Sequence, residues 1–210
     1  NQVQMVSDIG MNFASGIRSL MRQDPDIIMV GEIRDLETAE MAIQAALTGH
    51  LVLSTLHTND APTAVTRLLD LGVPAYLLQS TLLGVMAQRL VRTLCPKCKK
   101  AGGMRAEDEE AWNVLVLPWK SNMPRTIYHP VGCLDCRMTG YQGRMGLYEI
   151  MLMTPELRKL VTGQTDLGSL RDQATREGMK PLRISGARKV AAGLTTIDEV
   201  LKVAPPVQGA

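Results

Sequence analysis

The sequence is poor in aromatic side chains and has almost no excess of charge. One Phe, two Trp and four Tyr make up 3% of the 210 residues, and 23 basic against 21 acidic side chains leave a formal net charge of +2. A core must therefore be aliphatic, with the 13 Met residues filling irregular gaps. The balanced charge gives no general reason to bind nucleic acid or an acidic substrate, and we expect nucleic acid not to be a partner.

The chain also lacks a long apolar run. Its longest mostly apolar stretch, residues 73–87, contains Gln79, Ser80 and Thr81, so it is too short and too polar to span a bilayer. The first residues do not show the basic segment and apolar run of a signal peptide. We therefore expect a soluble cytoplasmic protein that can lie on a membrane surface. Its composition, 45% hydrophobic and 21% charged, is ordinary for a globular protein.

A P-loop is missing as well. This GxxxxGK[ST] loop cradles phosphates with its backbone N–H groups and its lysine. The nearest match begins at Gly163, but it has Ser169 where lysine is required and Leu170 where a hydroxyl is required. The match also falls in a predicted turn between helices instead of between a strand and a helix. We therefore expect that the chain cannot hold a nucleoside triphosphate unaided.

The first ninety residues alternate between short apolar runs and helical patterns. Residues 27–30 are a continuous apolar run that predicts a strand buried on both faces, as in a parallel sheet, and residues 51–56 predict a second buried strand. Asp35 is a good N-cap, and Gly49 is a good helix end. Helical spacing predicts helices over residues 13–22, 36–47, 61–71 and 74–88. The order strand, loop, helix, repeated twice, indicates an α/β fold, in which ligands bind outside the carboxyl ends of the strands.

Polar loops follow both predicted strands. Glu32 lies two residues after the first strand, where an acidic residue can hold a Mg²⁺-bound water near the phosphates of a nucleotide. The alternative is a solvated loop capped by Asp35. His50 and His57 flank the second strand, and only one other His is present. His57 is a candidate donor that senses a γ-phosphate, although single histidines are more often structural.

Four cysteines form two pairs, Cys95–Cys98 and Cys133–Cys136, and no cysteine is left over. Two residues between the members of each pair let both thiolates reach one metal, so two pairs predict a closed, structural Zn–S₄ site. Disulfides are not expected in a cytosolic protein, and a redox CxxC motif would explain only one pair. An iron–sulfur cluster is a further alternative. His129 is expected to be a surface residue, because four thiolates already fill the site.

The first cysteine pair lies in a basic segment with no acidic residue before Glu107. Its basic residues are Arg89, Arg92, Lys97, Lys99, Lys100 and Arg105. A basic rim around a zinc module can bind nucleic acid or an anionic membrane leaflet. The interpretation we favour is a solvated face whose positive charge balances the thiolates.

The remainder of the sequence predicts a strand and then helices. A helix is expected near residues 107–115, and a strand over 145–152 is expected to rejoin the main sheet, which makes the cysteine segment an insertion. Further helices are predicted over 155–162, 166–177, 181–192 and 195–203, followed by a disordered tail at 204–210. The predicted domains are the core (1–94), the zinc insertion (95–136), the returning strand (137–153) and a helical subdomain (154–210).

Five segments, in order along the chain, resemble the type II secretion and type IV pilus assembly ATPases. Residues 22–35 match the Walker B region of that family, and residues 49–60 resemble its histidine box. Residues 87–98 and 139–149 resemble the start and the end of its zinc module. Residues 192–200 resemble its C-terminal end. Several long motifs in the right order make this resemblance specific.

The resemblance implies a RecA-like (P-loop NTPase) core fragment with an inserted tetracysteine zinc module and a C-terminal helical subdomain. It implies a homo-hexameric ATPase on the cytoplasmic face of the bacterial inner membrane. That ATPase would use ATP and Mg²⁺ to power type II secretion or type IV pilus assembly, together with platform and anchoring proteins. Glu32 would be the Walker B acid, His50 and His57 the histidine-box residues, and Arg34 would join Glu32 and His57 at the nucleotide.

The sequence departs from the family in one respect. It begins after the expected P-loop and after the family's aspartate box, so we expect part of a longer ATPase, inactive by itself. The zinc pairs argue against the retraction motors of the family. A different class of function remains an alternative, namely a zinc-dependent binding module that docks a protein partner or nucleic acid without hydrolysis.

Overall fold

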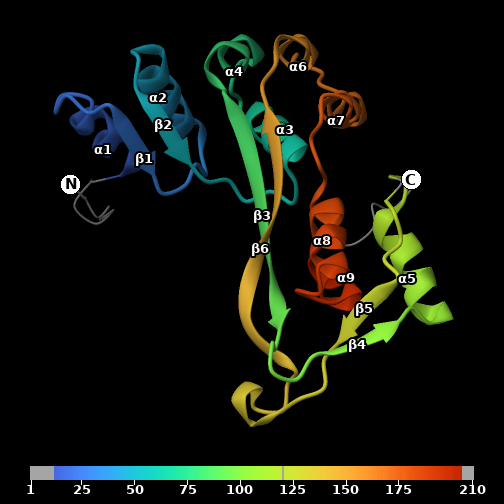
Figure 1. The fold of residues 1–210 in the computed structure, drawn as a ribbon. Helices are drawn as coiled ribbons and strands as arrows, with labels where there is room; N and C mark the ends of the chain where they lie inside the picture. The colour runs from blue at the N-terminus through green and yellow to red at the C-terminus, as the bar shows by residue number, and fades with distance from the viewer. Residues whose placement is uncertain (1–11, 120, 205–210) are drawn as a thin grey trace. The chain divides into compact units, whose positions relative to one another are not determined.

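The computed structural model describes residues 12–119 and 121–204, and these divide into two compact units (Figure 1). The first unit holds residues up to 85 together with 151–177, and the second holds residues 86–150 together with those from 178 onward. The division falls inside β3 (Gly84–Leu94) and β6 (Tyr141–Leu152), which pair with each other. The predicted domain boundaries at residues 94, 136 and 153 stay a prediction.

The first unit contains a parallel pair of strands and several helices. Its described elements, besides the ends of β3 and β6, are α1 (Phe13–Leu20), β1 (Ile27–Val30), α2 (Leu36–Leu47), β2 (Leu51–Ser54), α3 (Ala61–Asp70), α4 (Ala75–Thr81), α6 (Pro155–Leu160) and α7 (Leu167–Arg176). In the sheet, Ile27 lies opposite Leu51 and Val30 opposite Ser54. Because β1 and β2 are parallel, the loops that follow them lie at one edge of the sheet.

Side-chain caps explain where the helices of this region begin. The Asp35 carboxylate accepts a hydrogen bond of 2.8 Å from the backbone N–H of Thr38, which starts α2 as predicted. Asp60 does the same for α3 by accepting from Thr63 N at 2.9 Å. After α2, Gly49 has a φ of +99°, a conformation that ends a helix and that residues with a Cβ rarely adopt.

The predicted burial of both sheet faces is wrong for this structure. One face is covered, since Ile28 and Val30 are buried in a cluster with Ile17 of α1. On the other face Ile27 is 59% and Met29 72% exposed, and Leu51 and Leu53 of β2 are exposed as well. A continuous apolar run marks a strand that can be covered on both sides, but it does not supply the element that would pack there.

The predicted helix over residues 74–88 is correct only up to Thr81, and its last residues belong to β3 instead. The buried residues Ala87, Val91 and Leu94 are spaced four and three positions apart, which is also the spacing of a helix face. Pairing with β6 decides the conformation, because strand preference depends strongly on tertiary context. At Gly84 a Cβ atom would lie 2.9 Å from Met151 O, so only glycine permits the close approach there.

The predicted strand over residues 145–152 is confirmed and begins earlier, at Tyr141. Its predicted pairing is wrong, because β6 pairs with β3 in a separate two-stranded sheet and not with β1 or β2. Strand pairing depends on which strand edges the folded chain brings together, and a run of apolar residues does not indicate which strand will pair with it.

The second unit combines a small pair of antiparallel strands with three helices of the described chain. Besides most of β3 and β6, its elements are β4 (Lys100–Gly103), α5 (Ala106–Val116), β5 (Thr126–His129), the 3₁₀ turn η2 (Leu134–Cys136), α8 (Leu182–Ala191) and α9 (Ile197–Val203). β4 and β5 are antiparallel. The largest fully buried side chains of this unit include Trp112, Leu115, Leu147, Val190 and Val200.

The remaining helix predictions are confirmed. The helices α6, α7, α8 and α9 begin and end within two residues of the predicted limits, and α5 covers the predicted residues 107–115. Of the predicted disordered tail, residues 205–210 lie outside the described residues. In the described part of the chain, no helix combines the length and the apolar character needed to cross a membrane.

Candidate functional site

The structure brings Glu32, Arg34 and His57 together at the carboxyl edge of the parallel strands. Glu32 Oε2 lies 3.0 Å from His57 Nε2, and Glu32 Oε1 lies 2.6 Å from Arg34 Nη2. The two loops are also joined directly, because Thr55 Oγ1 donates to Gly31 O at 2.7 Å. The side chains predicted to face a nucleotide therefore share the edge where α/β folds bind ligands.

The electrostatics of this cluster keep Glu32 ionised. The hydrogen bond from Arg34 lowers the pKa of Glu32, burial opposes this in part, and the hydrogen bond from His57 lowers it further. Since an ionised carboxylate only accepts hydrogen bonds, His57 Nε2 carries the proton between them. The His57 side chain is 84% exposed, against 21% for Glu32. Glu32 is thus a fixed anion, and His57 a donor open to solvent.

His50 lies apart from this cluster, before the first residue of β2 and so at the other end of that strand. Its Nδ1 donates to Ala45 O at 2.9 Å and lies 3.1 Å from Thr48 Oγ1. These contacts tie the imidazole to the last turn of α2, where carbonyl groups otherwise lack partners. The structure therefore brings His57, but not His50, to Glu32.

An ion pair that the sequence pattern did not predict anchors the end of the second loop. Arg171 Nη2 of α7 lies 2.8 Å from Asp60 Oδ2, and Thr63 donates to Asp60 Oδ1 through its backbone N–H and its hydroxyl. Burial raises the pKa of Asp60, but the hydrogen bonds from Thr63 and Arg171 outweigh it and lower the pKa below its usual value. Asp60 is visible in the sequence as a helix cap, whereas nothing in the sequence marks Arg171 as its partner.

The four predicted metal ligands come together in the second unit. The Sγ atoms of Cys95, Cys98, Cys133 and Cys136 all lie within 4.8 Å of one another. Cys95 and Cys133 are 3.9 Å apart, Cys98 and Cys136 are 3.8 Å apart, and Cys133 and Cys136 are 3.7 Å apart. In a tetrahedron with Zn–S bonds of about 2.3 Å the sulfurs lie about 3.8 Å apart. The arrangement therefore fits one tetrahedral ion held by four thiolates.

Backbone N–H groups point at the sulfurs. Gly132 donates to Cys98 Sγ at 3.3 Å, and Cys133 and Gly140 each donate to Cys136 Sγ at 3.2 Å. Burial raises the pKa of Cys136, but the backbone hydrogen bonds from Cys133 and Gly140 outweigh it, together with hydrogen bonds from the Cys133 and Cys98 thiols, and lower the pKa to about 6. The pKa of the neighbouring Cys133 thiol is raised to about 11. The hydrogen bonds therefore stabilise a thiolate, the form of cysteine that binds metals.

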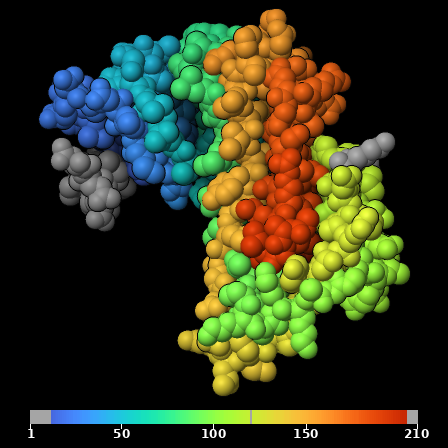
Figure 2. Space-filling view, viewed as in Figure 1, coloured from blue at the N-terminus to red at the C-terminus, as the bar shows by residue number. Residues whose placement is uncertain are grey.

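The tip of this cysteine loop is exposed on the second unit. Figure 2 shows the segment around η2, coloured yellow, at the surface of its unit. Leu134, between Cys133 and Cys136, is 91% exposed. Beside it, Lys97 Nζ lies 2.6 Å from Asp135 Oδ1, which joins the two cysteine turns. His129, on β5, is only partly exposed and lies outside the four-cysteine group.

Most of the basic residues around the first cysteine pair have local partners. Arg92 Nη2 lies 2.6 Å from Glu199 Oε1, and Lys99 Nζ donates to Gly193 O at 2.7 Å. Arg105 pairs with Asp108 on α5. The contacts of Arg92 and Lys99 join this segment to α9 and to the turn before it, which favours a structural role for the basic segment over a free surface for nucleic acid.

The segment that most resembled a P-loop lies in the turn between α6 and α7, where residues 163–170 join two helices and enter the second. A P-loop joins a strand to a helix. The rejection of this match is therefore confirmed by its place in the fold.

Comparisons with known proteins agree with the resemblance. The family described as type II/IV secretion system protein matches residues 1–202. The type IV pilus assembly ATPase TfpB of Acinetobacter baylyi is 57% identical over 205 residues, which are 98% of this chain and 34% of TfpB. The type II secretion system protein HxcR of Pseudomonas aeruginosa is 48% identical over 203 residues, which are 97% of this chain and 39% of HxcR. The chain thus spans little more than a third of the length of these relatives.

A solved structure shows the same fold. The pilus retraction motor PilT with bound ADP matches with a TM-score of 0.62 and 25% sequence identity, over 95% of this chain and 45% of that chain. The likeness shows an α/β, ATPase-like fold. The order of strands, loops and helices predicted the α/β class, and the resemblance implied the ATPase-like core.

Proposed function

The chain belongs to the type II/IV secretion system protein family, and we propose that it is part of an ATPase that powers type II secretion or type IV pilus assembly. The observation that carries this proposal is the Glu32 carboxylate, held by Arg34 and His57 where the parallel strands end. The higher identity to a pilus assembly ATPase than to a retraction motor supports assembly or secretion over retraction. Family membership leaves the alternative of a stand-alone binding module without support.

Each residue of the cluster has a proposed part. Bound ATP and Mg²⁺ would supply the reacting phosphate and the charge that stabilises it. Glu32, ionised and fixed at both oxygens, holds and orients a water at the edge of the sheet. Arg34 keeps that carboxylate ionised and in place. His57 can leave Glu32 and donate to an anion, because its side chain is largely exposed. Loss of that anion would return His57 to Glu32.

His50 has a different proposed part from the one implied by the resemblance alone. Its Nδ1 is engaged by Ala45 O at 2.9 Å, so the ring fixes the connection between α2 and β2. We assign it to positioning β2, at whose far end His57 lies. A role at the phosphates would require His50 to reach the Glu32 cluster, which lies after the strands, whereas His50 lies before β2.

The cysteine cluster would hold one structural zinc ion. Cys95, Cys98, Cys133 and Cys136 supply four sulfurs at tetrahedral spacing, and a site with four protein ligands leaves no open position for catalysis. A four-iron cluster would spread the sulfurs farther apart, because each thiolate would bind a different iron. Zinc bound here would stabilise the loop that carries η2 and fix it to the second unit.

The wider setting follows from the family. The longer protein would be a RecA-like motor that assembles as a homo-hexamer on the cytoplasmic face of the bacterial inner membrane, with platform and anchoring proteins as partners. The 210 residues contain no GxxxxGK[ST] sequence, so this chain by itself would hydrolyse little or no ATP.

The test of the proposed ATPase uses the longer protein that contains this chain. Glu32→Ala should reduce ATP turnover by at least about a hundredfold while nucleotide binding stays measurable, because the carboxylate acts in the transition state whereas other groups bind the phosphates. The control is Glu40→Ala, an exposed acid on α2, which should leave turnover unchanged. Equal turnover in the two variants would remove Glu32 from the catalytic role.

A further inference from the structure

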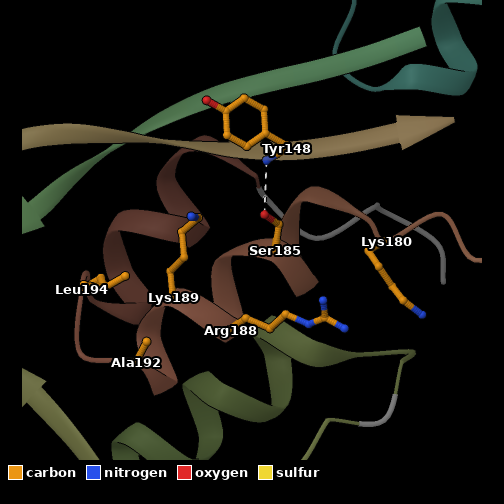
Figure 3. A pocket seen from close by; sticks show the side chains of 7 residues that line it. All are labelled: Tyr148, Lys180, Ser185, Arg188, Lys189, Ala192 and Leu194. Carbon is orange, nitrogen blue, oxygen red and sulfur yellow. Dashed lines mark hydrogen bonds between the residues drawn. The ribbon is translucent and has the colours of Figure 1, made fainter. Parts of the chain in front are cut away.

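A basic pocket lies along α8 in the second unit. Its volume is about 260 Å³, and Figure 3 shows Ser185 in its middle, flanked by Lys189 on one side and Lys180 on the other, with Arg188 below. None of the side chains that line it is acidic. The pocket is therefore a concentration of positive charge, in a chain whose overall charge is nearly balanced.

The basic pocket is one face of a helix. Four of the lining residues lie on one side of α8 or at its end, namely Ser185, Arg188, Lys189 and Ala192. The last three lie three, four and seven positions after Ser185, which is the spacing of one helix face. The opposite side of the helix packs into the core through Ala187 and Val190. On the pocket side, Arg188 and Ala192 are exposed, and Ser185 and Lys189 are partly exposed.

Helix stability explains only part of this charge. Arg188 and Lys189 lie in the last turn of α8, where cations interact favourably with the helix dipole. Lys180 lies before the first residue of the helix, where the dipole disfavours a cation. In the described part of the chain, none of these three side chains forms an ion pair, whereas Arg92 and Lys97 elsewhere in the unit do. Three unpaired cations that line one pocket raise its affinity for an anion.

The pocket also offers a hydroxyl and apolar surface. Tyr148 N of β6 donates to Ser185 Oγ at 3.2 Å, which leaves the Ser185 hydroxyl hydrogen available for an outside acceptor. Tyr148 is 42% and Leu194 37% exposed beside the cations. The volume is below the range of about 300–1,000 Å³ typical of pockets that enclose a small molecule, and it suits one or two side chains.

We propose that the basic pocket formed by Lys180, Ser185, Arg188 and Lys189 binds an acidic segment of a partner protein. In that segment, carboxylates would flank one apolar side chain. The carboxylates meet the three cations and the Ser185 hydroxyl, and the apolar side chain packs on Tyr148 and Leu194. This surface belongs to the second unit, whereas the Glu32 cluster belongs to the first.

The experiment titrates the whole chain into a fluorescently labelled peptide of alternating Glu and Leu residues and follows the anisotropy. The double variant Arg188→Gln with Lys189→Gln should weaken binding roughly threefold to tenfold, since each exposed charge contact contributes up to about 1 kcal/mol. Lys180→Gln, which lies outside the helix and cannot weaken it, should also reduce binding. Binding should fall further as the ionic strength rises from about 0.01 M to about 0.15 M, which shortens the Debye length from about 30 Å to about 8 Å.

The matched control replaces two exposed cations of the same unit that lie outside the pocket, Lys100→Gln with Arg125→Gln, and should leave binding unchanged. A peptide of alternating Glu and Ser tests the apolar contact and should bind more weakly than the Leu peptide. Equal loss of affinity in the pocket and control variants would overturn the proposal, because it would show attraction by net charge alone. Inorganic phosphate that competes with the Leu peptide and binds as tightly would also overturn it, in favour of a small-anion site.

Discussion

Arg171 Nη2 lies 2.8 Å from Asp60 Oδ2, although the two residues are 111 positions apart. The pair joins α7 to the loop that begins with His57 and ends with Asp60 at the start of α3. Both side chains are about three quarters buried, with 26% and 24% exposure. A substitution in α7 can therefore alter the loop that carries His57, one of the proposed nucleotide contacts.

Arg171→Ala should lower the free energy of unfolding of the first unit by about 1 kcal/mol at neutral pH, because it leaves Asp60 with only its contacts to Thr63. The pKa of Asp60 is lowered in the folded chain, so the stabilisation is present above the usual pKa of the carboxyl and is lost as the pH falls through the folded value. The difference between the variant and the parent should thus vanish in acid. Urea unfolding followed by far-UV circular dichroism measures it.

Arg176→Ala, an exposed position on the same helix, is the control and should have little effect. Both Trp residues belong to the second unit, so the tryptophan fluorescence transition should not move in either variant. A shift of that transition by Arg171→Ala would mean that the pair does not act within the first unit.

His57→Ala, in the longer protein, should affect transport more than hydrolysis. If His57 reports the presence of the γ-phosphate, its loss should reduce the conformational difference between ATP and ADP states and leave part of the turnover intact. ATPase rate and secretion or piliation are measured side by side. His129→Ala on β5 is the control. Equal, modest effects of His57→Ala and Glu32→Ala on both measurements would contradict the roles given to the pair.

The purified chain should contain about one zinc ion, and Cys133→Ser should lose it. The loop around η2 and then the second unit should lose stability, since a structural zinc site contributes directly to folding, while the first unit keeps its circular dichroism transition. Metal analysis and tryptophan fluorescence during unfolding measure the two effects. Leu134→Ser is the control, because it changes an exposed residue of the same loop and leaves all four thiolates in place. This variant should keep the zinc. A metal-free parent chain that melts like Cys133→Ser would show that the site is structural without an ion.

Glu199→Gln should destabilise the second unit by about 2 kcal/mol at neutral pH, a figure that allows for the partial exposure of Arg92. The hydrogen bond from Arg92 lowers the pKa of Glu199 to about 2, against an opposing effect of burial. Because the folded pKa is depressed, this stabilisation is complete above the usual value of about 4.5 and is lost as the pH falls toward 2. Tryptophan fluorescence during urea unfolding at neutral pH and near pH 3 follows it.

The control for this prediction is Asp198→Asn, the exposed acid next to Glu199 at the start of α9. It should change stability by no more than a few tenths of a kcal/mol. A Glu199→Gln effect that stays the same at neutral pH and near pH 3 would show that packing, and not the ion pair with Arg92, supplies the stabilisation.

Local patterns alone determined most of the helices and the meeting of the four cysteines. Asp35 and Gly49 set the ends of α2 because capping depends on residues within one turn. The paired spacing of the cysteines predicted that their sulfurs would meet, since each CxxC turn brings two thiolates to the same side. The apolar run before Glu32, followed by a polar loop, predicted a strand that ends at a ligand-binding loop, because both signals lie within a few residues of each other.

Only the tertiary structure decided which distant groups meet. β3 and β6 became partners because two strand edges were brought together, although residues 87–94 also carry a helical spacing of buried positions. The structure brought His57 to Glu32 but left His50 at the other end of β2. Arg171 reached Asp60, and Lys180 joined Arg188 and Lys189 in one pocket, by packing alone. The spacing of apolar residues indicates which side of a helix or strand is buried. Which element packs against that side depends on contacts between residues far apart in the sequence.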